Sequence, residues 1–192
     1  MKHFYSLFFL LLLSCPLFSQ SLATKEEEGG CLTLITNFIY DKTGLLSLGS
    51  NLNGVSLCYR VDINGGNETF ALRFGIETIS SEFSFDKNAN LYLKTFSDKV
   101  VILQQLLSCE EVPKDNAQNE YYHVYPMYTI AKDDLVSIMN EGIKKMLFMT
   151  TKGYYPCNYG KDIVGENIRK EYEFLLNIAN KKINKESFDK DF

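Results

Sequence analysis

The sequence predicts an α+β fold: a mainly antiparallel β-sheet with a short helix and a C-terminal helix packed on it. Apolar and polar residues alternate, with many β-branched and aromatic types, over most of residues 31–160. Turn-forming residues interrupt this alternation. Apolar residues then recur at helical spacing near the C-terminus. We expect about seven to nine strands, arranged as a sandwich or a partly open barrel.

The first 19 residues predict a secretory signal peptide. A short basic start is followed by an apolar run over residues 7–13, and Pro16 precedes the small residue Ser19. The run is too short for a membrane span, which takes about 20 apolar residues. An alternative stays open, because the four residues that end in Cys15 resemble a bacterial lipobox. We expect a secreted or periplasmic protein or, with lipid on Cys15, a membrane-anchored lipoprotein.

The charge of the remaining chain argues against a nucleic-acid partner. Residues 20–192 hold all 24 Asp and Glu but, without Lys2, 19 of the 20 Lys and Arg, so their net charge is near −5. Nucleic-acid binding requires a basic patch or stripe. The length suits a single domain. We place this domain at residues 31–183, after a flexible leader at 20–30 and before a polar tail at 184–192.

Four cysteines follow the signal peptide, widely spaced at Cys31, Cys58, Cys109 and Cys157. Zinc and iron–sulfur sites use closely spaced thiolates, so we expect no metal site here and no cofactor. In an exported chain an even number of cysteines predicts two disulfides, with three connectivities open. The alternative is that some of them are small buried thiols.

The best-specified element is a hairpin formed by residues 55–62 and 70–77, which both alternate. With Gly65 and Gly66 as a two-residue loop, every apolar residue meets an apolar partner. The pairs are Val61 with Phe70, Tyr59 with Leu72, Leu57 with Phe74, and Val55 with Ile76. Cys58, Arg60 and Arg73 fall on the opposite face.

The other strands are expected on both sides of this hairpin. Their β-branched and aromatic composition and the turns between them set the limits. The predicted ranges are 31–40, 45–49, 90–96, 99–107, 121–130, 143–151 and 154–159. A polar loop at 110–120 precedes the strand that begins at residue 121.

Two helices are predicted in the C-terminal half. Residues 132–142 have Asp133 and Asp134 in the first turn, where negative charge favours the helix dipole, and Gly142 at the end. Residues 162–182 carry apolar side chains at helical spacing, which predicts an amphipathic helix docked on the sheet.

The stretch from Tyr128 to Tyr172 reads YTIAKDDLVSIMNEGIKKMLFMTTKGYYPCNYGKDIVGENIRKEY. It resembles small exported bacterial proteins of unknown function, which end in a strand, a short helix, a strand hairpin and a final helix. The resemblance covers about a quarter of the chain. It implies this order of elements and no particular mechanism.

Few residues are available for catalysis. His3 lies in the signal peptide, which leaves His123 as the other histidine of the chain. No cysteine-protease signature and no G-x-S-x-G elbow occurs. The acidic pair Asp133–Asp134 has an adequate structural explanation at its helix start, and a glycosidase needs a carboxylate separation that a sequence cannot show. A hydrolase is therefore the third hypothesis.

Tyrosines suggest where binding could occur. Alternate residues of a strand share a face, which groups Tyr121, His123 and Tyr125 beside the polar loop. Exposed tyrosines are common at protein and sugar interfaces, although tyrosines also suit a half-buried sheet. We predict an exported, non-enzymatic interaction or scaffold domain with these residues as a recognition patch for another exported or cell-surface protein. The alternative is a carrier whose curled sheet encloses a lipid-like or sugar-like ligand.

Overall fold

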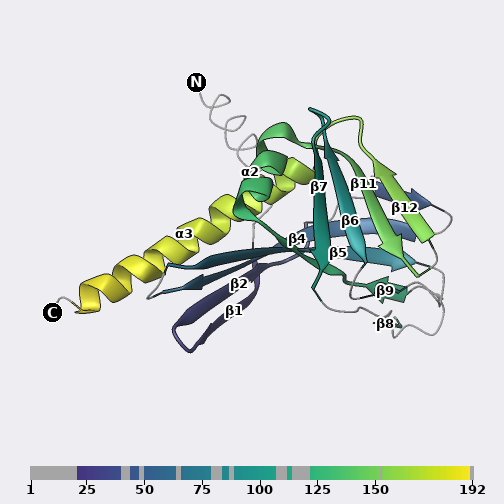
Figure 1. Cartoon of the computed structure of the whole chain (residues 1–192). Helices are drawn as coiled ribbons and strands as arrows, with labels where there is room; N and C mark the ends of the chain where they lie inside the picture. The colour runs from purple at the N-terminus through teal and green to yellow at the C-terminus, as the bar shows by residue number, and fades with distance from the viewer. Residues whose placement is uncertain are drawn as a thin grey trace, which may run out of the picture.

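The computed structural model describes residues 21–39, 44–47, 50–63, 66–78, 84–86, 89–106, 112–113, 122–151 and 153–190. In these residues twelve strands form one open sheet, in which every paired strand is antiparallel, together with two helices (Figure 1). The prediction of an α+β fold with a mainly antiparallel sheet and a C-terminal helix is confirmed. The sheet is single and open. The predicted signal peptide at residues 1–19 lies outside the described residues.

The elements follow one another in the expected order. The first strands are β1 (Leu22–Glu28), β2 (Cys31–Thr36), β3 (Gly44–Ser47), β4 (Ser50–Asp62), β5 (Glu68–Thr78) and β6 (Asn90–Thr95). They are followed by β7 (Val100–Gln105), β8 (Val112–Pro113), β9 (Tyr122–Val124), β10 (Met127–Ile130), α2 (Lys132–Glu141), β11 (Ile143–Thr150), β12 (Gly153–Asn158) and α3 (Val164–Lys190).

The sheet runs in the order β1-β2-β4-β5-β10-β7-β6-β11-β12. Strand β3 pairs with β4, and β9 pairs with both β5 and β8. In Figure 1 the strands β6, β7, β11 and β12 cross the direction of β4 and β5, so the sheet turns sharply along its path. This turn brings β12 close to β3 and encloses the core on one face.

Residues 22–28, predicted as part of a flexible leader, form strand β1 instead. Gly29 and Gly30 both have positive φ, at 58° and 80°, as a tight hairpin turn between β1 and β2 requires. Glu27 on this strand pairs with Lys182 of α3 at 2.9 Å. A polar composition alone indicates a flexible leader, whereas two successive glycines are a hairpin signal. Polar residues suit β1 because most of its side chains are exposed.

The β4–β5 hairpin has the predicted faces but a register shifted by two residues. Tyr59 lies opposite Phe70 and Leu57 opposite Leu72, rather than opposite Leu72 and Phe74. The loop is longer than predicted, because Asp62 and Asn67 are already joined by a backbone hydrogen bond of 2.9 Å. A shift of two residues leaves every side chain on its face, so alternation cannot distinguish the two registers.

The predicted strand at 121–130 is divided into β9 and β10. Pro126 has no N–H to donate to the ladder, so pairing is interrupted there. Both pieces keep one register on β5, with Val124 opposite Ile76 and Met127 opposite Arg73. Together with β1 and the short β8, this division raises the strand number above the predicted range.

The core lies between the enclosed face of the sheet and α3. Phe74, Tyr128 and Phe148, from three different strands, are fully buried, and the Phe74 and Phe148 rings meet edge to face at 5.3 Å between centroids. Ile168 and Leu175 of α3 are buried, and α3 packs on strands β2 and β4. Burial of this kind contributes about 25 cal/mol per Å² of apolar surface.

Helix α3 is longer than the prediction of a helix over 162–182 followed by a polar tail. Asp162 caps its start, since Oδ1 accepts the Gly165 N–H at 2.9 Å. The helix continues to Lys190 through residues that were predicted to be a polar tail. Lysine and glutamate are frequent there, and both are good helix formers, so a polar composition is compatible with helix.

Candidate interaction surface

The predicted recognition patch is partly assembled in the structure. His123 lies on β9, and Tyr125 follows it at the interruption before β10. Their rings stack with centroids 6.1 Å apart and an interplanar angle of 10°. Tyr125 is 40% exposed and His123 is half-buried. Tyr121, the third predicted member, lies outside the described residues.

Tyr125 is held at this position by the strand register. The pairs on either side of it place Tyr125 opposite Gly75 of β5. A Cβ atom added to Gly75 would lie 3.5 Å from the ring of Phe38, an ordinary van der Waals distance, so the Phe38 ring lies directly over this position of β5. Phe38 then stacks on Tyr125, with centroids 5.5 Å apart.

Arg73 completes this cluster from the neighbouring position on β5. Its Cζ lies 4.3 Å from the ring centroid of Phe38 and 5.9 Å from that of Tyr125. Such contacts between a guanidinium and aromatic rings are favourable by roughly 0.5 to 2 kcal/mol. We call the cluster of Phe38, Arg73, His123 and Tyr125 the arginine–aromatic surface.

The electrostatics of Arg73 are unusual for a side chain at a surface. Its Nε is buried and has no hydrogen-bond partner. Burial lowers the pKa of Arg73, an effect that Tyr125 and Cys58 oppose only in part. A guanidinium remains charged even so, because its ordinary pKa lies far above neutral pH. Among the described residues, no carboxylate forms an ion pair with Arg73.

Cys58 of β4 lies on the same outer face of the sheet as Arg73 of β5. Its thiol is poorly suited to act as a nucleophile. Burial raises the pKa of its thiol, and the charges of Arg73 and Arg60 reverse only part of this shift. The reactive form of cysteine is the thiolate, which a raised pKa disfavours at neutral pH.

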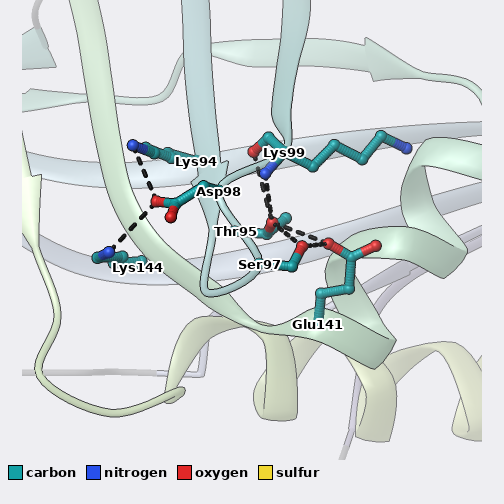
Figure 2. Close-up of polar contacts among 7 residues, drawn as sticks. All are labelled: Lys94, Thr95, Ser97, Asp98, Lys99, Glu141 and Lys144. Carbon is teal, nitrogen blue, oxygen red and sulfur yellow. Dashed lines mark hydrogen bonds and ion pairs between the residues drawn. The ribbon is translucent and has the colours of Figure 1, made fainter.

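A second polar cluster joins the β6–β7 turn to the end of α2 (Figure 2). Glu141 Oε2 accepts hydrogen bonds from the hydroxyls of Thr95, at 2.8 Å, and Ser97. Both bonds lower the pKa of Glu141, with the larger effect from Ser97. A carboxylate with a lowered pKa is a weak general base. The cluster is therefore best explained as a structural clasp between turn and helix.

On the other side of the same turn, two lysines neutralise the carboxylate of Asp98, as Figure 2 also shows. Asp98 has a positive φ of 67°. A three-residue hairpin loop is a type I turn followed by one residue in the left-handed conformation, and Asp98 is that residue. Its carboxylate accepts from Lys94 at 2.9 Å and from Lys144 at 3.3 Å. These exposed ion pairs lower the pKa of Asp98.

The described cysteines do not form the expected disulfides with one another. Cys31 and Cys58 are free thiols on neighbouring strands, but Cys58 pairs with Ile35, four residues from Cys31. Four residues of strand span about 13 Å, whereas disulfide-bonded Cα atoms lie within about 7 Å. Cys157 is a buried thiol that donates to the hydroxyl of Tyr159 at 3.2 Å. Cys109 and Cys15 lie outside the described residues.

The described residues lack two further features. They contain no group of three or more His, Cys, Asp or Glu side chains placed to hold a metal ion. None of the helices in this part of the chain is long and apolar enough to cross a membrane.

Of the residues in the arginine–aromatic surface, sequence reasoning identified His123 and Tyr125 as binding candidates and placed Arg73 on the outer face of its strand. It missed Phe38, because nothing in the alternation shows that this residue crosses over Gly75. No family model matches the chain, and neither the curated proteins nor the solved structures contain a significant match to it.

Proposed function

We propose that this chain is an exported, non-enzymatic interaction domain that recognises another exported or cell-surface protein through the arginine–aromatic surface. The observation that carries the proposal is the stack of Phe38, Tyr125 and His123 beside Arg73 on the outside of the sheet. Tyrosine and arginine are enriched among the residues that dominate binding energy at protein interfaces. The layout of residues 1–19 supports export.

The packing of the cluster also suits recognition. Backbone pairing on β5 holds Tyr125, and the rings restrain one another, so little side-chain freedom remains to be lost on binding. The enclosed face of the sheet is filled by large aromatic side chains, among them Tyr59, Phe74 and Phe148. This filling favours a partner on the outer surface over a small ligand in the interior.

Site-specific photo-crosslinking tests the proposal. A benzophenone amino acid replaces Tyr125 in one variant and Tyr154 in the control, where Tyr154 is a 62% exposed tyrosine on β12. Both variants are exposed to the exported fraction of the native cells and irradiated. We expect position 125 to give one saturable crosslinked protein that an excess of the unmodified chain displaces. Equal or absent crosslinking at both positions would remove the arginine–aromatic surface as an interface.

A further inference from the structure

Arg73 is a cation in a partly apolar environment, and the described part of the chain supplies no carboxylate to pair with it. Its Nε is buried without an acceptor, and none of the ion pairs among the described residues involves Arg73. The same face of β5 carries Glu77, but four residues of strand separate it from Arg73, which is about 13 Å. A charge-assisted hydrogen bond donated by the guanidinium to an external acceptor would satisfy this cation.

The arrangement of the rings limits what that acceptor can be. Phe38 has Arg73 on one side and Tyr125 close by, and Tyr125 stacks with both Phe38 and His123. The ring faces are thus largely used within the cluster. A sugar needs an open ring face to stack on, whereas hydrogen-bond donors remain on the guanidinium. These donors match a planar carboxylate, which a guanidinium binds in a bidentate manner.

We infer that Arg73 is the binding site for a carboxylate group of a peptide segment, with Tyr125 and Phe38 contacting the adjoining residues. The carboxylate belongs to an acidic side chain or to the C-terminus of the partner. This inference rests on the proposed function and specifies the chemistry of the segment that the arginine–aromatic surface recognises.

Nuclear magnetic resonance of the chain from residue 20 onward tests this inference with three short peptides. The first is capped at both ends and has one central glutamate. The second has glutamine instead and a free C-terminal carboxylate. The third has glutamine and capped ends, so that it carries no charge. We expect the first or the second to shift the backbone amide signals of Tyr125 and Met127 saturably, and the third to leave them unchanged.

Two variants assign the effect to Arg73. Arg73→Gln should weaken the binding of the active peptide by at least about tenfold, since hydrogen bonds to charged groups are the stronger class. Arg60→Gln removes the same charge from an exposed position four residues from Ser56, the cross-strand partner of Arg73, and should change binding by less than about twofold. The dispersion of the amide signals shows whether each variant remains folded.

Three outcomes would overturn the carboxylate site. They are equal shifts with all three peptides, no shift with either charged peptide, and binding of glucuronate in a parallel titration without binding of the peptides. The crosslinking experiment at position 125 is independent of these peptide titrations. Persistence of a crosslinked partner would then mean that the surface binds protein without using Arg73 as a carboxylate site.

Discussion

At Arg73 the chain places a charge in a partly buried position and stabilises it with rings instead of a carboxylate. Burying a charge is costly unless a partner is provided. Phe38 and Tyr125 supply part of the stabilisation through their π faces. The alternation of β5 places Arg73 on the outer face, but contact with Phe38 depends on a segment that returns over Gly75.

Thr95 carries a prediction at the same scale. It is fully buried, donates to Glu141 and accepts the Lys99 N–H at 3.1 Å. Thr95→Val keeps the shape and removes both bonds, which leaves the Lys99 N–H without this acceptor. We expect unfolding in urea to show a loss of about 1 to 3 kcal/mol.

Thr129→Val serves as the matched control, because Thr129 is exposed on β10 and carries no comparable buried bond. Its expected effect is within about 0.5 kcal/mol. Equal losses in the two variants would show that the clasp between turn and helix contributes nothing specific to stability.

At the level of elements, α3 docks on the sheet with one of its carboxyl groups buried. Glu171 is 1% exposed, and neither of its carboxyl oxygens has a hydrogen-bond partner. Burial raises the pKa of Glu171 to about 8, although the nearby Thr36 hydroxyl and Leu57 N–H act in the opposite direction. The Leu57 N–H is already engaged, since it donates to Thr36 Oγ1 at 3.0 Å.

This burial predicts a pH dependence of stability. Between the unfolded pKa of 4.5 and the folded value of about 8, the native state holds a proton that the unfolded state releases. The free energy of unfolding should therefore fall as pH rises through this range, by at most about 1.4 kcal/mol per pH unit from this group. Above about pH 8 this contribution no longer changes.

Glu171→Gln should abolish this slope and raise stability at pH 8, because the amide is neutral at every pH. Glu173→Gln changes an exposed position on the same helix and should retain the slope. Urea unfolding of the three proteins from pH 5 to pH 9 provides the measurement. A slope that survives in Glu171→Gln would assign the dependence to other groups.

The hairpin illustrates what periodicity can specify within an element. It placed Tyr59 and Phe70 on the core side, where both are buried. It could not choose between registers that differ by two residues, because these share the same faces. The choice is made by the loop, which closes with the Asp62–Asn67 hydrogen bond.

For the whole molecule, the edges of the open sheet matter most. Strand β1 covers β2 at one end, and β12, which contains Pro156, forms the other. Proline at an edge hinders pairing with other chains. Strand β1 ends in three glutamates, Glu26 to Glu28. Charged side chains at an edge also hinder pairing with other chains.

Removal of residues 20–29 should therefore expose β2 as a new edge. We expect the shortened chain, starting at Gly30, to be less stable and to form dimers or larger species at micromolar concentration, as measured by size-exclusion chromatography with light scattering. Removal of residues 185–192 from the end of α3 is the control and should leave the chain in the state of the parent. A monomeric, equally stable shortened chain would show that β1 is dispensable.

The sequence by itself determined the fold class, the order of the elements and the faces of most strands, because local periodicity and turn residues carry that information. Strand alternation in the sequence also placed His123 and Tyr125 on the same face. Only the tertiary structure decided the recruitment of β1, the hairpin register and the position of Phe38 over Gly75 beside Arg73. These features depend on contacts between residues distant in the chain, where several arrangements satisfy the same local pattern and packing selects one of them.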